Sequence, residues 1–115
     1  MNVWLFEDNL MWSARLERAL RGLGHQPSVR TTSTIVDAPD VAIVNLGRST
    51  FDLESLVPAL LERGVYVVGH AGHKEKDLLD RGQRLRCSKV ATNSEVANKM
   101  ASILAEAGGR LPGTG

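Results

Sequence analysis

Three apolar runs of strand length recur along the chain, and each is followed by polar residues. The runs are Val3–Phe6, Val41–Val44 and Tyr66–Gly69. Unbroken apolar runs are typical of strands that are buried on both faces of a parallel sheet, whereas half-exposed strands alternate. Between the first two runs, Leu10–Leu23 carries apolar residues at helical spacing, including Trp12 on the inward face. This alternation predicts an α/β fold with a parallel sheet covered by helices.

Two weaker strands complete the pattern. Ser28–Thr32 has a β-branched bias, and Leu85–Lys89 precedes the last helical segment. Five strands in alternation with helices predict a flavodoxin-like, doubly wound parallel sheet with the strand order 2-1-3-4-5. Only residues 33–40 separate the second strand from Val41. A parallel crossover needs a dozen or more residues to hold its helix, so the second crossover helix should be shortened or missing, leaving apolar sheet exposed as a contact surface.

The remaining helices are predicted from their boundary residues. Pro58 is tolerated in a first helical turn, so Ser55 is the expected N-cap of the helix before Gly64. A short helix is expected over Lys74–Arg81, ending at Gly82. Thr92-Asn93-Ser94-Glu95 matches a capping box for a last helix that buries Val96, Met100, Ile103 and Leu104.

Composition favours one ordinary globular domain. The chain has 115 residues, of which 43% are hydrophobic and 23% charged, with a formal net charge of +1. We therefore expect a domain over residues 1–107 and a flexible Gly- and Pro-rich tail over 108–115.

Near-neutral charge gives no reason to expect nucleic-acid binding. The chain has no apolar run of about 18 residues and no signal peptide, so we expect a cytoplasmic protein without membrane association. The single cysteine, Cys87, is expected to be a buried apolar side chain.

Polar residues end the predicted strands, where the carboxyl edge of a parallel sheet gathers them. Glu7 and Asp8 follow the first strand, Asn45 the third, Gly69 ends the fourth and Lys89 the fifth. This layout resembles the receiver domain of bacterial two-component response regulators. The resemblance implies an acid pair that holds Mg²⁺, an aspartate that accepts a phosphoryl group, a Ser or Thr that senses it, and a lysine.

Carried over onto this sequence, the resemblance gives Glu7 and Asp8 as the acid pair and Lys89 as the lysine. Asn45 stands at the phosphoacceptor position and Gly69 at the hydroxyl position. An amide has no nucleophilic oxygen comparable to a carboxylate, and glycine has no hydroxyl, so the phosphorylation site is degenerate. These residues predict a pseudo-receiver that acts through protein contacts, as a partner-binding module or a homodimer, without enzymatic activity.

Three alternatives remain open from the sequence. Glu7 and Asp8, with the Asn45 carbonyl, supply oxygen ligands for a weak Mg²⁺ site, and the same crevice would suit a sensor of a small ligand or a divalent metal. His70 and His73 have a metal-ligand spacing, but we expect them to be exposed on a loop. The basic run of Arg81, Arg84, Arg86 and Lys89 is either a docking patch or a set of solvated charges on an edge strand. No other cofactor is expected.

Overall fold

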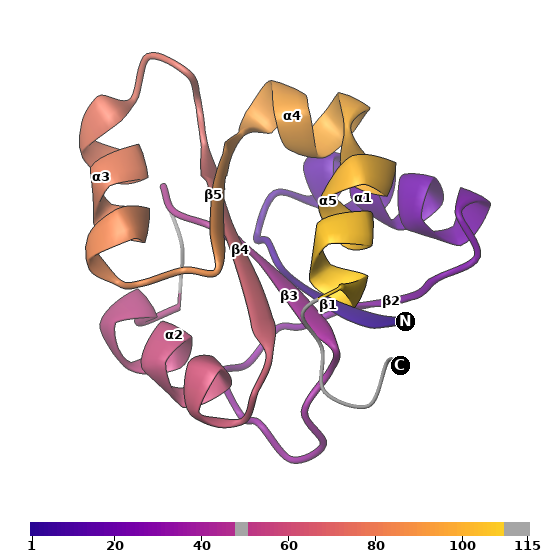
Figure 1. Ribbon diagram of the computed structural model, residues 1–115, viewed down its shortest axis with the longest axis horizontal. Helices are drawn as coiled ribbons and strands as arrows, with labels where there is room; N and C mark the ends of the chain where they lie inside the picture. Colours follow the sequence, from indigo (N-terminus) through magenta and orange to yellow (C-terminus); the bar gives the residue numbers. More distant parts are fainter. Residues whose placement is uncertain (48–50, 110–115) are drawn as a thin grey trace.

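The computed structural model describes residues 1–47 and 51–109, which form a five-stranded parallel sheet flanked by helices (Figure 1). The strand order is β2-β1-β3-β4-β5, which confirms the predicted doubly wound, flavodoxin-like fold. The strands are β1 (Asn2–Phe6), β2 (Gln26–Val29), β3 (Val41–Asn45), β4 (Tyr66–Ala71) and β5 (Lys89–Thr92). The helices are α1 (Leu10–Gly22), α2 (Leu53–Glu62), α3 (Lys76–Arg84), α4 (Asn93–Asn98) and α5 (Met100–Gly108).

The helices lie in two layers, one on each face of the sheet. Figure 1 shows α1, α4 and α5 on one side of the sheet and α2 and α3 on the other. Each face has its own apolar cluster: Leu5 and Ile43 point into the α1/α4/α5 cluster, while Phe6 and Val44 point into the α2/α3 cluster. Because neighbouring strand residues face opposite sides, this assignment also decides which strand-end residues meet at the edge of the sheet.

No helix forms between β2 and β3, which confirms the prediction of a missing crossover helix. The prediction of exposed apolar sheet at this point is wrong, because Trp4 and Phe6 on that face are only 8% and 0% exposed. The Arg30 guanidinium lies 4.2 Å from the centre of the Trp4 ring, and the half-buried Ile35 packs against the same cluster. The cation–π contact and the segment between β2 and β3 thus cover the part of the sheet that the missing crossover helix leaves open.

Helix α2 begins earlier than the position of its proline suggested. It starts at Leu53 with Asp52 as N-cap, so Ser55 is not the cap and Pro58 lies inside the helix. The predicted start was wrong because Leu53 is buried with Leu56 in the α2/α3 cluster. Burial of a leucine side chain contributes about 2 kcal/mol, which offsets much of the cost of an internal proline.

Helix α3 runs past the glycine that was expected to end it. Gly82 lies within α3 and is buried, and a Cβ atom there would come within 2.8 Å of Leu46 Cδ1 and 3.0 Å of Val90 Cγ2. This glycine therefore allows the helix to approach the sheet closely and does not act as a helix stop. The predicted end of the helix at Arg81 is wrong for this reason, because α3 continues to Arg84.

The capping box at the start of the last helical segment is confirmed. Thr92 Oγ1 accepts a hydrogen bond from the Glu95 N–H at 3.1 Å, and Glu95 Oε1 accepts one from the Thr92 N–H at 2.9 Å. The segment that follows is two helices, α4 and α5, divided at Lys99. The four expected core residues, Val96, Met100, Ile103 and Leu104, are all buried.

One sequence prediction concerns residues beyond the described part of the chain. The tail predicted over residues 108–115 is described only to Gly109, with α5 reaching Gly108. Within residues 1–47 and 51–109, no helix is long and apolar enough to span a membrane.

Candidate functional site

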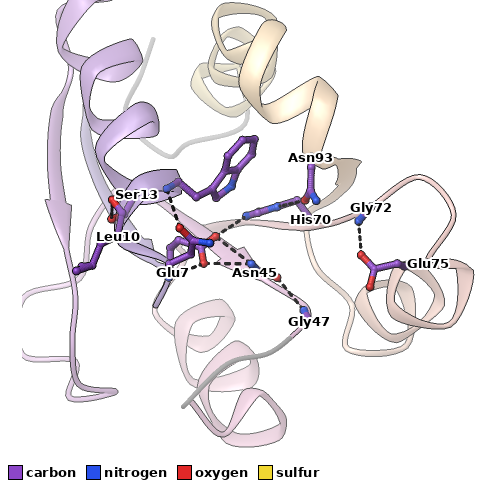
Figure 2. Close-up of polar contacts among 11 residues, drawn as sticks. Glu7, Leu10, Ser13, Asn45, Gly47, His70, Gly72, Glu75 and Asn93 are labelled. Carbon is purple, nitrogen blue, oxygen red and sulfur yellow. Dashed lines mark hydrogen bonds and ion pairs between the residues drawn. The ribbon is translucent and has the colours of Figure 1, made fainter.

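Four polar residues from four strand ends line up on the α1/α4/α5 face at the carboxyl edge of the sheet. Asn45 pairs with His70 in the register of β3 and β4, so both side chains point to the same face. Glu7 follows β1 and Asn93 follows β5, and Figure 2 shows the four side chains in one row, linked by dashed contacts. We call Glu7, Asn45, His70 and Asn93 the polar row.

The centre of the polar row is a hydrogen-bonded contact between Glu7 and Asn45. Asn45 Nδ2 donates to both carboxylate oxygens of Glu7, at 2.9 Å to Oε1 and 3.1 Å to Oε2 (Figure 2). The Asn9 N–H donates to Glu7 Oε2 at 3.2 Å, and the Gly47 N–H donates to Asn45 Oδ1 at 2.8 Å. Glu7 is only 4% exposed, so the Asn45 amide and the Asn9 N–H take the place of water around a buried carboxylate. The Asn45 amide thus leaves the charge of Glu7 in place but supplies hydrogen bonds to its carboxylate.

His70 closes the row against β5. Its ring is fully buried, with Nδ1 2.7 Å from Asn93 Oδ1 and Nε2 3.8 Å from Glu7 Oε1. Burial lowers the pKa of His70, while the hydrogen bond that its ring makes to Asn93 and the charge of Glu7 act in the opposite direction. The contact with Glu7 is an ion pair only if the ring is protonated; because desolvation is the largest influence on its pKa, we assign a neutral ring at pH 7. A neutral ring that donates Nδ1–H to Asn93 leaves the Nε2 lone pair facing the carboxylate.

This placement corrects the sequence prediction for His70 and for Gly69. The fourth strand extends to Ala71, so His70 is a buried strand residue, and only His73 remains in the exposed turn. Gly69 pairs with Val44 and faces the α2/α3 side, where a Cβ would lie 3.0 Å from Cys87 Sγ and 3.1 Å from Leu46 Cδ1. The residue of β4 that faces Asn45 is therefore His70, and Gly69 points away from the polar row.

The predicted place of Lys89 is also wrong. Lys89 begins β5, where it pairs with Val68, and its Nζ lies 3.2 Å from Glu106 Oε2 on α5. It therefore belongs to the amino-terminal half of the strand, away from the polar row. The prediction failed because residues 85–88, expected to form the strand, form the turn that follows α3, in which Arg86 takes the left-handed conformation (φ 64°). The residue that follows β5 at the polar row is Asn93.

The expected metal ligands are arranged unfavourably for Mg²⁺. Both oxygens of Glu7 and Oδ1 of Asn45 accept hydrogen bonds from within the chain, while Asp8 is exposed. Mg²⁺ requires several oxygen ligands in near-octahedral positions, so binding would require breaking the contacts of the polar row. Among the residues that the structure describes, no group of three or more His, Cys, Asp or Glu side chains could hold a metal ion.

Trp12 is a member of the site that the sequence assigned only to the core. Its ring centre lies 6.3 Å from that of His70, and Nε1 is buried without a hydrogen-bond partner. His70 Nε2 is the other buried side-chain atom of the described chain without a partner. Both lie beside the polar row. The sequence signal for Trp12 was its helical spacing. This spacing indicates that the side chain lies on the buried side of α1, but it does not indicate which strand residues the ring lies against.

A crevice opens beside the polar row, on the β2 side. It has a volume of about 190 Å³, and its lining includes Glu7 and Asp8, the apolar side chains of Leu10, Val29 and Phe51, and Arg30 and Thr31. Leu10 is 80% exposed at the start of α1. The crevice thus combines an apolar wall with two acids and one base, which is a common composition for a small-ligand site.

The fold is that of a response-regulator receiver domain, as comparison with solved structures shows. A receiver protein from Burkholderia phymatum superposes with a TM-score of 0.77 at 15% identity, covering 96% of this chain and 98% of that one. The receiver domain of the TMAO respiratory regulator TorR gives a TM-score of 0.73 at 17% identity, with 91% and 97% covered. NtrX from Brucella abortus gives 0.76 at 14% identity, with 92% of this chain but 27% of that chain covered. No protein-family model and no curated protein matches the sequence.

Proposed function

We propose that this chain is a receiver-like protein-interaction module that works without phosphorylation and has no catalytic activity. The observation that carries the proposal is the Glu7–Asn45 contact, in which both Nδ2 hydrogen bonds end on the carboxylate. The amide at the end of β3 offers no nucleophilic oxygen to a phosphoryl donor. It also holds Glu7 in an arrangement that a bound cation would have to disrupt.

The other members of the polar row support the same function. The resemblance to receivers implies a hydroxyl at the end of the fourth strand and a lysine after the fifth, both of which bind phosphoryl oxygens. In this chain His70 and Asn93 lie at those ends and bind each other at 2.7 Å. A neutral, buried imidazole supplies neither a sensing hydroxyl nor a fixed positive charge. A row held together in this way is a fixed structural element of the module, not a switch.

Phosphorylation is tested with acetyl phosphate or beryllofluoride and Mg²⁺. We expect no phosphoryl adduct by intact mass spectrometry and no change in tryptophan fluorescence, for which Trp12 beside His70 is a local reporter. A receiver domain that retains its aspartate serves as the positive control. A phosphoryl adduct on any residue of the polar row, or saturable beryllofluoride binding, would contradict the proposed function.

A second candidate function is a sensor of a small ligand or divalent metal that uses the crevice beside the polar row. The mixed lining of that 190 Å³ cavity, with Glu7, Asp8 and Arg30, is the observation that favours it. Open α/β sheets bind ligands at this edge. Thermal-shift measurements with divalent cations, nucleotides and amino acids test it, with Asp8→Ala as the variant. A shift that disappears in Asp8→Ala supports the sensor, and the absence of any shift removes it.

A further inference from the structure

A groove of about 530 Å³ separates α2 from the turn that joins α3 to β5, on the opposite face of the sheet from the polar row. Its lining includes three apolar residues, Pro58 and Leu61 from α2 and Leu85 from the turn. Leu85 is 8% exposed, whereas Pro58 lies open to solvent. Figure 1 shows α2 and α3 side by side on this face of the sheet. The groove thus has an apolar floor between two walls, one formed by α2 and the other by the end of α3 and the turn that follows it.

The two walls are tied together by one acid. Glu54 Oε1 on α2 lies 3.4 Å from Arg81 Nε and 3.1 Å from Arg84 Nη2, both on α3. These arginines lower the pKa of Glu54, with the Arg84 hydrogen bond as the largest cause. Two members of the basic run are therefore occupied within the chain, and Lys89 is occupied by Glu106. The ion pairs hold the walls of the groove in place without binding anything outside it.

Two charges at the groove, one on each wall, have no ion-pair partner among the described residues. Glu62 ends α2 and Arg86 lies in the α3–β5 turn; both are exposed, and neither forms an ion pair with a residue that the structure describes. Arg86 also has a φ of 64°, in the left-handed region that favours glycine. A non-glycine residue there costs on the order of 1 kcal/mol, so the arginine side chain is kept at some expense of stability.

We propose that this groove is the contact surface between two copies of this chain related by a two-fold axis. Glu62 of each copy pairs with Arg86 of the other, and the two apolar floors face each other between these pairs. The inference rests on the proposed protein-interaction function and names its partner. The unpaired charges are equal in number and opposite in sign, so they favour neither an acidic nor a basic partner. A surface with one of each on opposite walls is complementary to itself after a two-fold rotation, which is the requirement for a symmetric dimer.

Charge exchange between the two positions tests this pairing. Wild-type protein is followed by sedimentation velocity and light scattering over a wide range of concentrations, beside Arg86→Glu, Glu62→Arg and the double variant. Two-fold symmetry means that each single substitution creates two like-charge contacts. We expect each single variant to weaken the dimer at least tenfold. We expect the double variant, and an equimolar mixture of the two single variants, to recover it.

Controls separate dimerisation from folding. Arg18→Glu makes the same charge change as Arg86→Glu, on an exposed position of α1 on the other side of the sheet, and should leave the dimer intact. Arg86→Gly removes the side chain while relieving the left-handed conformation, so it should unfold at a higher temperature yet associate more weakly. A wild-type monomer at all concentrations, or a dimer that tolerates both single reversals, overturns the proposal. A monomer that takes up no phosphoryl group would overturn the dimer but leave the proposed function standing. A phosphoryl adduct on a protein that is dimeric would overturn the proposed function but leave the dimer standing.

Discussion

Replacing Asn45 by aspartate is the most informative perturbation of this molecule, because a single amide-to-acid change restores the nucleophile that the receiver resemblance implies. In the wild-type protein Nδ2 lies 2.9 and 3.1 Å from the two oxygens of Glu7. The substitution removes this donor and places a second carboxylate at that distance from the first. Glu7 is 4% exposed, so water cannot separate the two acids.

The cost follows from Coulomb's law and from proton uptake. Two charges about 3 Å apart repel by roughly 5 kcal/mol at an effective dielectric constant of about 20. Binding one proton at pH 7 relieves the repulsion at a cost of about 4 kcal/mol, because an aspartate pKa lies about 3 units below that pH. The protonated acid can then donate to Glu7 again. We therefore expect Asn45→Asp to lose about 2–4 kcal/mol at pH 7 and less than about 1 kcal/mol near pH 4.

Urea unfolding at several pH values measures this difference between Asn45→Asp and wild type. Addition of Mg²⁺ should recover much of the loss in the variant and change the wild type little, because two facing carboxylates attract a cation. Asn98→Asp, an exposed position on α4, adds the same charge and should cost less than about 0.5 kcal/mol. Equal stability of Asn45→Asp and wild type at pH 7 without Mg²⁺ would refute the Glu7–Asn45 contact.

Three further predictions concern single side chains near the sheet. The pKa of His70 is lower in the folded protein than in the unfolded chain, so His70 binds its proton in the unfolded chain as the pH falls below about 6.5. The stability that neutral His70 contributes is therefore fully present above that pH and is lost as the pH falls. His70→Gln should flatten this slope between pH 7 and 5, leaving the smaller part due to His25, whose pKa is also lowered; an unchanged slope would exclude His70 as its source. Gly69→Ser should lose about 1–3 kcal/mol by overpacking against Cys87 and Leu46, and should not bind beryllofluoride; a stable variant that binds it would contradict the assigned face of Gly69. Burial raises the pKa of Cys87 to about 11, so the folded protein should react with a thiol reagent at pH 8 far more slowly than the urea-unfolded chain, and equal rates would count against it.

Local sequence pattern was sufficient to predict most of the fold. The apolar runs at Val3 and Val41 became β1 and β3, and the capping box at Thr92 begins α4 as expected. Each of these signals acts over a few residues, through burial on both faces of a strand or through a side chain that caps a helix. The short distance between β2 and β3 likewise excluded a crossover helix before any contact was known.

The errors occurred where neighbours in space outweighed local pattern. Pro58 indicated a later helix start, but the buried Leu53 extends α2. A glycine at position 82 is typical of a helix end. In the structure, however, Gly82 lies within α3, where a Cβ atom would collide with Leu46. The local pattern predicts a strand for the basic segment before Lys89, but this segment forms a turn with Arg86 in a left-handed conformation. Arg30 covers Trp4, a contact for which no short-range signal exists.

The sequence by itself determined the doubly wound sheet, the amide at the end of the third strand and its nearness to Glu7. Only the tertiary structure decided the rest of the site, because register sets which strand-end residues share a face and a shift of one residue turns a side chain to the other side of the sheet. In this register the residue of the fourth strand that faces Asn45 is His70, in place of Gly69. The residue that reaches the site from the end of the fifth strand is Asn93, in place of Lys89. Asn45 therefore lies within a half-buried row of polar residues that bind one another, and this row is what a phosphoryl donor would meet.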